Sequence, residues 1–410
     1  MKIHLIGQLN FNKISKKGNG NIQSFPSFLM KEWGDFMNKI KLLLPGVLLC
    51  VVLILLSNWL ADGFAVLLRS LGILSENSGS PVSGIFIAIL IGIVIRNTIG
   101  LKQTFLTGVQ FSMKVLLKAG IILLGLRLSL VEALKLGAWG IPLIISCITV
   151  GLVVTLYFTK KLNQSERLGT LTACGTGICG VTAIMATAPV IKAKDDEISY
   201  AVANITIFGL VSMFIYPFLA HFFFADEPVK AGLFLGTAIH DTAQVTGAAL
   251  IYSESYQAEQ VVDVATVTKL TRNLFIILII PILSYLFYRK NTAEKATTKI
   301  PRWQDLVPLF VLGFLALSLL RTIGDVMLQN SGNAFWLFNE DVWQQLYGSV
   351  STVSATFLLG AAMAGVGLST DLKKLKGLGM KPFFIGLIAA LSVSLVSFLL
   401  VYFFGHLISL

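Results

Sequence analysis

One stretch of the sequence places a titratable pair among small residues, between two apolar segments. Residues 236–250 read GTAIHDTAQVTGAAL, in which His240 precedes Asp241. Further polar side chains in this stretch are Thr237, Thr242, Gln244 and Thr246. Ionisable side chains inside a membrane segment are costly and usually line the path of a substrate or a proton. We interpret the stretch as half of a transport site, with a loop at the membrane surface as the alternative.

His240 and Asp241 are the candidates for coupling to H+ or Na+. Histidine titrates near neutral pH, and its surroundings can bring a carboxylate toward the same range. Adjacent residues on a helix point in different directions, so the two side chains need not touch. One of them can couple the ion while the other holds a helix in place. A structural polar pair, satisfied by neighbouring helices, is the alternative.

A second polar cluster covers residues 172–189, which read TACGTGICGVTAIMATAP. Three glycines within six residues oppose a regular helix, and N–H groups freed at the start of a half-helix bind anions without any cation. The substrate-binding candidates here are Thr176, Gly177, Cys179, Gly180 and Thr182. A flexible, tightly packed helix is the alternative. The spacing of Cys174 and Cys179 matches no standard zinc pattern, so we predict neither a metal nor a cofactor.

Three cations are further candidates for meeting an anion. Lys269 and Arg272 share a helical face and fall on the predicted outer side, against the usual charge bias. They are expected either to meet an anion in an outer vestibule or to reach lipid headgroups. Arg127 is a further cation near the predicted outer face.

The composition indicates a polytopic α-helical membrane protein. The chain has 410 residues, of which 55% are hydrophobic and 13% charged, and its mean hydropathy is +0.80. Soluble domains carry about 25% charged residues. Apolar runs of about 20 residues match spanning helices rather than the short alternating strands of a barrel. The net charge of +11 then reflects basic loops that face the cytoplasm, not nucleic-acid binding.

Eleven apolar segments follow a basic tail at residues 1–41, which we expect to be cytoplasmic and partly disordered, with an interfacial helix near residues 25–37. The segments are 42–61, 82–99, 112–128, 139–159, 168–191, 198–224, 231–252, 265–288, 304–324, 346–367 and 380–408. The fifth and the seventh are interrupted. Loop charges alternate as the positive-inside rule requires, with a cytoplasmic N-terminus. Two loops, 192–197 and 225–230, fit poorly, and both flank the interrupted segments.

An internal repeat relates two parts of the transmembrane domain at residues 42–410. Residues 125–142 align without gaps on residues 365–382, within hairpins at about 112–160 and 346–408. The identical pairs are Gly125/Gly365, Leu128/Leu368, Ser129/Ser369, Gly137/Gly377 and Pro142/Pro382. The two hairpins have opposite predicted orientations, which is typical of an inverted-topology repeat with interrupted helices near the midplane. A chance match between apolar segments is the alternative.

Several motifs together resemble the bacterial YeiH-like family of sulfate exporters. They are GIILLGLRLS (120–129), GTGICGVTAIMATAPVI (175–191), GTAIHDTAQVTGAA (236–249), KLTRN (269–273), PLFVLGF (308–314) and AMAGVGLST (362–370). The resemblance implies likeness to cation/proton antiporters and anion transporters. It further implies inverted repeats, two interrupted helices that cross near the midplane, and a core domain that moves against a panel domain. By the same analogy we expect a homodimer in the bacterial inner membrane.

The sequence therefore predicts a secondary active transporter for a small anion such as sulfate, a sulfonate or a carboxylate. A sodium/proton antiporter-like exchanger, with Asp241 as its ion site, is the alternative within transport. An intramembrane enzyme needs a nucleophile with a base or a set of metal ligands, and the sequence shows neither pattern. We therefore predict that the protein is not an enzyme.

Overall fold

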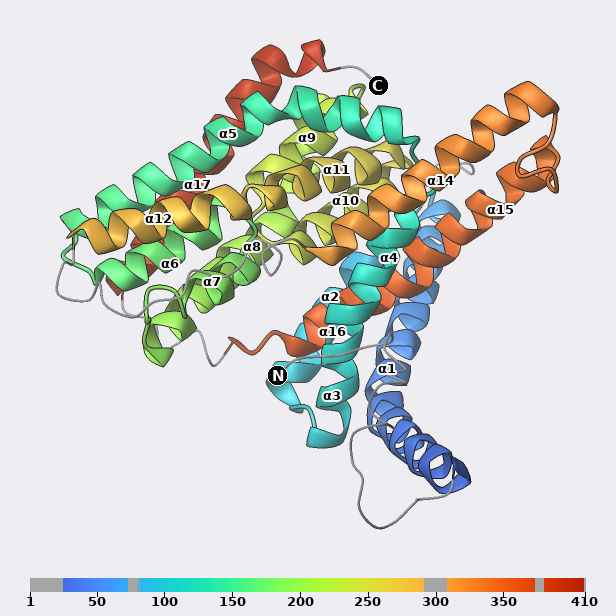
Figure 1. Cartoon of the computed structure of the whole chain (residues 1–410), viewed down its shortest axis with the longest axis horizontal. Coiled ribbons are helices and arrows are strands. Elements are labelled where there is room, and N and C mark those ends of the chain that lie inside the picture. Colours follow the sequence, from blue (N-terminus) through green and yellow to red (C-terminus); the bar gives the residue numbers. More distant parts are fainter. Residues whose placement is uncertain (1–24, 73–79, 81, 291–307, 373–379, 409–410) are drawn as a thin grey trace.

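The computed structural model describes residues 25–72, 80, 82–290, 308–372 and 380–408, and these residues are almost entirely helical (Figure 1). Within these ranges no β-strand forms, apart from one isolated bridge between Ala334 and Phe338. Eight helices in the described part are long and apolar enough to cross a membrane. The prediction of an all-α polytopic membrane protein is thus confirmed.

The helices form two bundles (Figure 1). The first, which we call the panel bundle, contains α1 (Phe25–Ser70), α2 (Gly84–Thr98), α3 (Gln103–Phe111), the π-helix η2 (Ser112–Leu116), α4 (Leu117–Leu124), α14 (Leu309–Ser331), α15 (Glu340–Val353), the π-helix η4 (Ser354–Leu359) and α16 (Gly360–Ser369). Small residues let these helices approach closely. A Cβ atom on Gly92 of α2, for example, would lie 2.8 Å from the backbone nitrogen of Leu368 in α16.

The second group, which we call the core bundle, holds the two interrupted segments. It contains α5 (Leu130–Lys161), α6 (Glu166–Gly177), α7 (Val181–Thr187), α8 (Asp195–Phe224), α9 (Pro228–Ala238), α10 (Thr242–Tyr256), α11 (Gln260–Leu274), α12 (Ile276–Lys290) and α17 (Met380–Phe404). The C-terminus of α17 leads into the short helix η6 (Gly405–Leu407). The two bundles meet where α10 packs on α2 and α16, and where α14 packs on α5.

The first interrupted segment folds back on itself as a re-entrant hairpin. The hydroxyl of Thr187 in α7 lies 3.2 Å from the sulfur of Cys174 in α6, which a straight helix would place about 20 Å away. After α7 the chain returns to where α6 begins, because Ser165 donates a hydrogen bond to Glu197 at the start of α8. We call α6 and α7, with the turn between them, the first hairpin.

The second interrupted segment also folds back, from the opposite end of the molecule. α10 runs alongside α8 in the same direction: Gln244 reaches the Thr206 carbonyl, and Tyr256 stacks on His221 near the end of α8. α9 begins four residues after α8 ends and runs the other way. We call α9 and α10, with the turn between them, the second hairpin.

The two ends of the molecule differ in charge. One end, here called the basic end, holds Lys161, Lys194 and Lys381, and the last two line one cleft there. The other, the acidic end, holds Asp226, Glu227, Glu254 and Glu259. The prediction of eleven crossings counted both interrupted segments as spans. In the structure each segment returns to its starting end, so the crossing helices are the eight long ones and the shorter α2.

This arrangement explains the two loops whose charges fitted poorly. Residues 192–197 lie at the basic end and residues 225–230 at the acidic end, each opposite to the side assigned from eleven crossings. The expected interfacial helix near residues 25–37 is instead continuous with the first spanning helix, since α1 runs from Phe25 to Ser70.

The sequence repeat coincides with a repeat of elements. In both copies a π-helix, η2 or η4, leads into a short helix, and a long helix, α5 or α17, follows. The first short helix ends at the acidic end, where Arg127 forms an ion pair with Glu259. The second short helix ends at the other end of α2, where Asn97 donates to the Thr370 carbonyl over 2.9 Å. A two-fold axis that relates the copies stays a prediction.

Candidate transport site

The turns of the two hairpins meet in the middle of the core bundle. Gly180 precedes α7 with a φ of +68°, a conformation that side chains with a Cβ rarely adopt. A Cβ on Gly180 would lie 2.7 Å from Oδ2 of Asp241 and 3.0 Å from its Cα. Glycine is therefore required twice at this position, once for the backbone angle and once for the contact with the second hairpin.

Lys269 in α11 binds the backbone of both turns. Its side chain is 1% exposed, and Nζ donates hydrogen bonds to the carbonyls of Ile178 (3.2 Å), Ile239 (3.0 Å) and His240. The carbonyl end of a helix carries unpaired acceptors and a partial negative charge, which a cation stabilises. One lysine thus caps α6 and α9 together.

Arg272, one turn further along α11, also binds the backbone of both hairpins, through its guanidinium group. Its fully buried guanidinium donates from Nε to Gly177 (3.0 Å), from one Nη to Thr237 (2.6 Å) and from the other to Thr176 (2.6 Å). All three acceptors are backbone carbonyls at the ends of α6 and α9. Arginine suits this position because its planar group presents several donors in a fixed fork.

Asp241 stands at the opposite pole of the turns, where α7 and α10 begin. It is the N-cap of α10, and Oδ1 accepts a hydrogen bond from the Ala243 N–H over 2.9 Å. Its other oxygen faces Gly180, the residue before α7. Helix N-termini carry a partial positive charge that a carboxylate stabilises. The site therefore matches charge to helix ends throughout, with cations at carbonyl ends and an anion at N–H ends.

The threonine candidates lie around the turns, but their hydroxyl protons are already used. Thr176, Thr237 and Thr246 each donate to the carbonyl four residues earlier, at 2.8, 2.6 and 2.9 Å. Only the lone pairs of these oxygens remain free to accept, and such oxygens suit a cation better than an anion. Thr182 is exposed in the first turn of α7, and Cys179 is buried in the first turn region.

Two buried polar side chains near the turns keep hydrogen-bonding capacity. Both ring nitrogens of His240 are buried and, within the described part of the chain, neither meets the geometry of a hydrogen bond, although the ring approaches the Thr176 carbonyl. Gln244 donates to the Thr206 carbonyl, and its own oxygen accepts no hydrogen bond from a described residue. A ligand or water at the turns would find these atoms available.

Two of the three candidate cations differ from their expected setting. Lys269 and Arg272 lie at the centre of the core bundle rather than in an outer vestibule or near headgroups. Arg127 does lie at the acidic end, but it pairs with Glu259 at 2.9 Å and with Asp263 at 3.0 Å. Two carboxylates offset its charge, which weakens the case for a direct role in anion binding.

Asn273 is a site residue that the sequence reasoning missed. It is buried next to Arg272, and its amide donates to the Thr242 hydroxyl over 3.1 Å, which ties α11 to the start of α10. The available signal was a polar amide inside an apolar segment, directly after two functional candidates.

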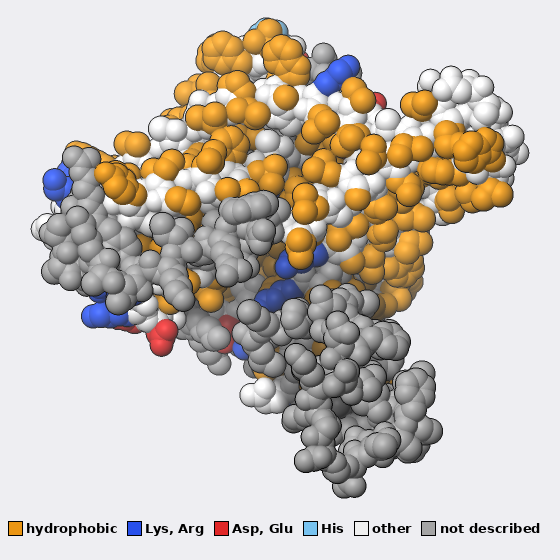
Figure 2. Space-filling view, viewed as in Figure 1, with side chains coloured by type: hydrophobic (Ala, Val, Ile, Leu, Met, Phe, Trp, Pro, Cys, Tyr) orange, Lys and Arg blue, Asp and Glu red, His pale blue; other side chains and the backbone are white. Residues whose placement is uncertain are grey.

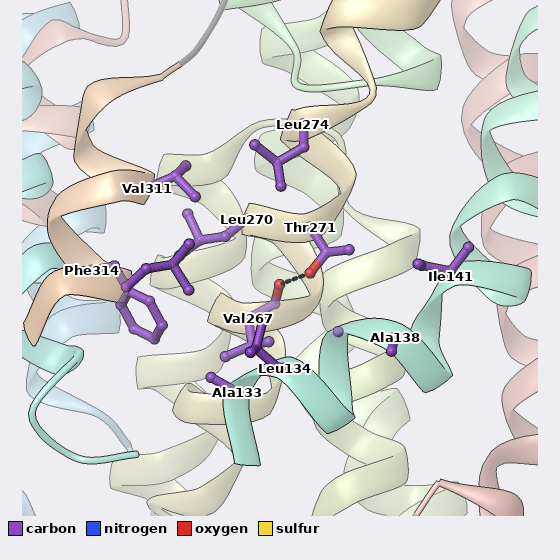
Figure 3. Close-up of a pocket in the computed structure, with 12 residues that line it drawn as sticks. Ala133, Leu134, Ala138, Ile141, Val267, Leu270, Thr271, Leu274, Val311 and Phe314 are labelled. Carbon is purple, nitrogen blue, oxygen red and sulfur yellow. Dashed lines mark hydrogen bonds between the residues drawn. The ribbon is translucent and has the colours of Figure 1, made fainter. Parts of the chain in front are cut away.

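Two clefts lie outside the meeting point of the hairpins. The first, of about 230 Å³, lies between α5, α11 and α14 and has no charged residue in its lining (Figure 3). Its Thr271 hydroxyl donates to the Val267 carbonyl, so this cleft offers nothing to an anion. The second, of about 520 Å³, opens at the basic end between α6, α8 and α17, and its charged lining residues are Lys194, Lys381, Asp196 and Glu197.

Comparison with known proteins adds the family. The family model described as "Conserved hypothetical protein 698" matches residues 45–386, which include both hairpins and α11. The chain belongs to this family. No solved structure matches it.

Bacterial relatives of this family cover most of the chain. A UPF0324 membrane protein of Bacillus anthracis is 36% identical over 326 residues, 78% of this chain and 86% of the relative. One from Streptococcus agalactiae is 32% identical over 354 residues, 86% of this chain and 95% of the relative. One from Fusobacterium nucleatum is 32% identical over 358 residues, 86% and 96% of the two chains. The protein is thus a membrane protein of the UPF0324 family, in agreement with the YeiH-like motifs.

Proposed function

We propose that the protein is a secondary active transporter of a small anion, such as sulfate, a sulfonate or a carboxylate, coupled to H+ or Na+. The observation that carries this proposal is the meeting of two re-entrant hairpins, one from each end, around buried charges. Interrupted backbone at membrane depth is tolerated where it lines a cavity, and transporters use half-helix ends to hold substrates and ions.

The charges around the turns favour an anion. Lys269 and Arg272 against Asp241 leave one positive charge in excess when all three are ionised. The first turn of α7 supplies N–H donors, and the exposed Thr182 belongs to that turn. Such a helix start binds anions.

Asp241 supplies a physical basis for coupling. It shares the helix N-termini with the proposed anion, and two negative charges at close range repel each other. A proton or a Na+ ion bound to Asp241 removes that repulsion, so the anion and the coupling ion bind together. By linkage, each then raises the affinity for the other. His240 is the second candidate for holding the proton.

The membrane orientation follows from the loops. The relatives are bacterial, and cytoplasmic loops of membrane proteins are rich in Lys and Arg. We therefore place the basic end, with its cleft of about 520 Å³, on the cytoplasmic side of the bacterial inner membrane. The homodimer stays a prediction.

The test is sulfate flux into proteoliposomes, with and without an imposed pH gradient. Wild-type flux should rise when protons are supplied on the side of the anion. Asp241→Asn should abolish this dependence on the gradient, because an amide cannot take up the proton. Asp226→Asn, at an exposed position of the acidic end, is the matched control and should behave as wild type. Absence of flux for sulfate, small sulfonates and small carboxylates, from protein that melts cooperatively, would refute anion transport.

Exchange of Na+ for H+ is the second candidate, because Asp241 is a carboxylate at the meeting point of two half-helices. The same vesicles with an internal pH dye test it. An outward Na+ gradient that acidifies the lumen without any added anion, as H+ enters in exchange for Na+, would favour this exchange over anion transport.

A further inference from the structure

A stripe of polar side chains runs along one face of a spanning helix in the panel bundle. Gln110, Lys114 and Lys118 are all exposed, and their spacing of four residues places them on one side of the helix α3–η2–α4. The opposite side of this helix is buried against the rest of the panel bundle: Gly120, for instance, packs on Leu359, and its carbonyl accepts a hydrogen bond from Ser354 over 2.8 Å.

The stripe reaches the middle of the membrane-spanning region. The candidate span covers Gln103–Leu124, and Lys114 is about 15 Å from either end at 1.5 Å per residue. Lysine in the middle of a span is costly in lipid, so it usually faces a water-filled cavity or the bundle interior. Within the described residues neither Lys114 nor Lys118 forms an ion pair. Their charge therefore calls for water or an anion.

Two contacts place the stripe at the seam between the bundles. Lys118 lies over the ring of Phe310, with Nζ 5.9 Å from the ring centroid. The next residue, Val311, lines the cleft of Figure 3 together with Leu270 and Leu274 of α11, the helix that holds both hairpin turns. Lys118 thus contacts α14, the helix that lines this cleft together with α11.

The other flank of the stripe packs on a panel-bundle helix that in turn contacts the core bundle. Met113, next to Lys114, packs on Gly365 of α16. The same helix places Met363 against Gly247 of α10, where a Cβ would lie 3.0 Å from the methionine sulfur. Figure 2 shows Lys and Arg side chains near the centre of one face, amid apolar surface. The stripe is therefore bordered on both flanks by elements that contact the core bundle.

We infer that Gln110, Lys114 and Lys118 line a water-filled path along this seam, and that the path attracts a small anion toward the hairpin turns. The identity of the anion as the transported substrate rests on the proposed function. The irregular backbone supports a functional role, because Lys114 belongs to the π-helix η2, and such bulges occur frequently at functional sites.

Thiol labelling tests the path without any transport. Gln110→Cys, Lys114→Cys and Lys118→Cys are labelled in sealed vesicles with an anionic and with a cationic methanethiosulfonate reagent. Val52→Cys, on an exposed apolar face of α1, is the control for a lipid-facing position, and the wild type reports on the four buried native cysteines. We expect all three stripe positions to react with the water-soluble reagents, and Val52→Cys and the wild type to remain unlabelled.

The charge of the path is tested by combining variants. At Lys114→Cys the anionic reagent should react faster than the cationic one, and adding Lys118→Gln should reduce that preference by about threefold or more, since the local potential falls. Labelling at Lys114→Cys no faster than at Val52→Cys would overturn the inference. So would a rate that falls when neutral vesicle lipid is replaced by anionic lipid, since headgroups would then occupy the stripe.

Flux measurements connect the path to the substrate. Lys114→Gln should raise the KM for sulfate several-fold while the maximal rate changes little, because the residue attracts the anion but does not hold it at the turns. If labelling succeeds and no small anion is transported, the path stands and the proposed function fails. If transport occurs and the stripe cysteines do not react, the path fails alone.

Discussion

Lys269 and Arg272 direct their charges at backbone carbonyls rather than at carboxylates. Six hydrogen bonds link these two side chains to the ends of α6 and α9. Hydrogen bonds to charged groups contribute more than neutral ones, and buried carbonyls left without a donor are costly. Lys269 and Arg272 therefore stabilise the arrangement of the two turns, whether or not their charges also attract a bound anion.

Arg272→Ala should lower the stability of the purified protein by about 3 kcal/mol or more, because it leaves three buried carbonyls without donors. Arg272→Lys should fall between this variant and the wild type, since a lysine keeps the charge but cannot reproduce the fork. Thermal unfolding in detergent measures both. Lys161→Ala, at an exposed position of the basic end, is the control. An unchanged melting temperature with lost anion binding would assign Arg272 to substrate rather than to structure.

Gly180→Ala should impair transport and destabilise the protein by about 1–3 kcal/mol, since it forces a side chain into a backbone region that only glycine adopts readily. The added methyl group would also press on Asp241. Gly140→Ala, where the nearest atom to the new Cβ lies at 3.8 Å, is the matched control and should be neutral or slightly stabilising. Equal melting temperatures and fluxes for the two variants would contradict the contact between the hairpins.

For single residues, the sequence indicated which residue types belong to the site, but not how deeply each side chain is buried in the molecule. His240, Asp241 and Gly180 could be selected because polar residues and glycines interrupt apolar segments. The burial of Lys269 and Arg272 could not be predicted from the sequence, because the depth of a residue in the membrane depends on how many preceding segments cross it. Lys114 and Lys118, like His240, are titratable residues inside an apolar run, so the sequence alone could have indicated them as candidates.

Among the elements, the two hairpins differ most from expectation. Hydropathy identifies a segment as apolar and interrupted. It cannot tell a segment that crosses the membrane from a re-entrant one, because both have the same kinds of residues. Only long-range contacts distinguish them, such as Thr187 with Cys174. The charges of residues 192–197 and 225–230 were the one local indication, and they agree with the re-entrant arrangement.

Cysteine accessibility from each side decides between crossing and returning segments. Asp195→Cys should be labelled from the same side as Lys161→Cys, and Asp226→Cys from the same side as Glu259→Cys, because each hairpin returns to its starting end. All four positions are exposed. An impermeant maleimide applied to spheroplasts and to inverted vesicles gives the measurement. Labelling of Asp195→Cys and Lys161→Cys from opposite sides would make the first interrupted segment a crossing, and the same result for Asp226→Cys and Glu259→Cys would make the second one a crossing.

The internal repeat corresponds to a similar order of elements, and its inverted topology stays a prediction. Both copies share the order of their elements, but the matched residues are shifted: Ser129 caps α5, whereas Ser369 is the last residue of α16. The ungapped alignment therefore predicted the order of the elements but not where each element ends, since α4 ends at Leu124 and α16 only at Ser369. The two short helices end at opposite ends of α2, in line with opposite orientations.

For the whole molecule, the proposed transport requires the panel and core bundles to move relative to each other. One link between them is at the acidic end, where Glu254 of α10 accepts hydrogen bonds from the Ser83 hydroxyl (2.5 Å) and from the Ile85 N–H (3.2 Å) at the start of α2. An interface between moving bodies has to break such contacts in each cycle.

Cross-linking Ser83→Cys to Glu254→Cys with a short bifunctional thiol reagent should therefore reduce flux at least tenfold, as expected when a required conformational step is blocked. The single variants treated in the same way, and a reagent that can be cleaved by reduction, are the controls. Flux that persists in fully cross-linked protein would show that these two elements do not separate during the cycle.

The position of α11 has a mechanical consequence. One helix grips the turns of both hairpins through Lys269 and Arg272, and Asn273 adds a third tie to α10. If one hairpin moved away from the other, Lys269 or Arg272 would lose hydrogen bonds to the backbone carbonyls of that hairpin's turn. Both half-sites are therefore fixed to one helix. In the proposed transport cycle, access should alternate because the hairpins and α11 move together as one rigid body past the panel bundle, while the contacts within the site stay intact.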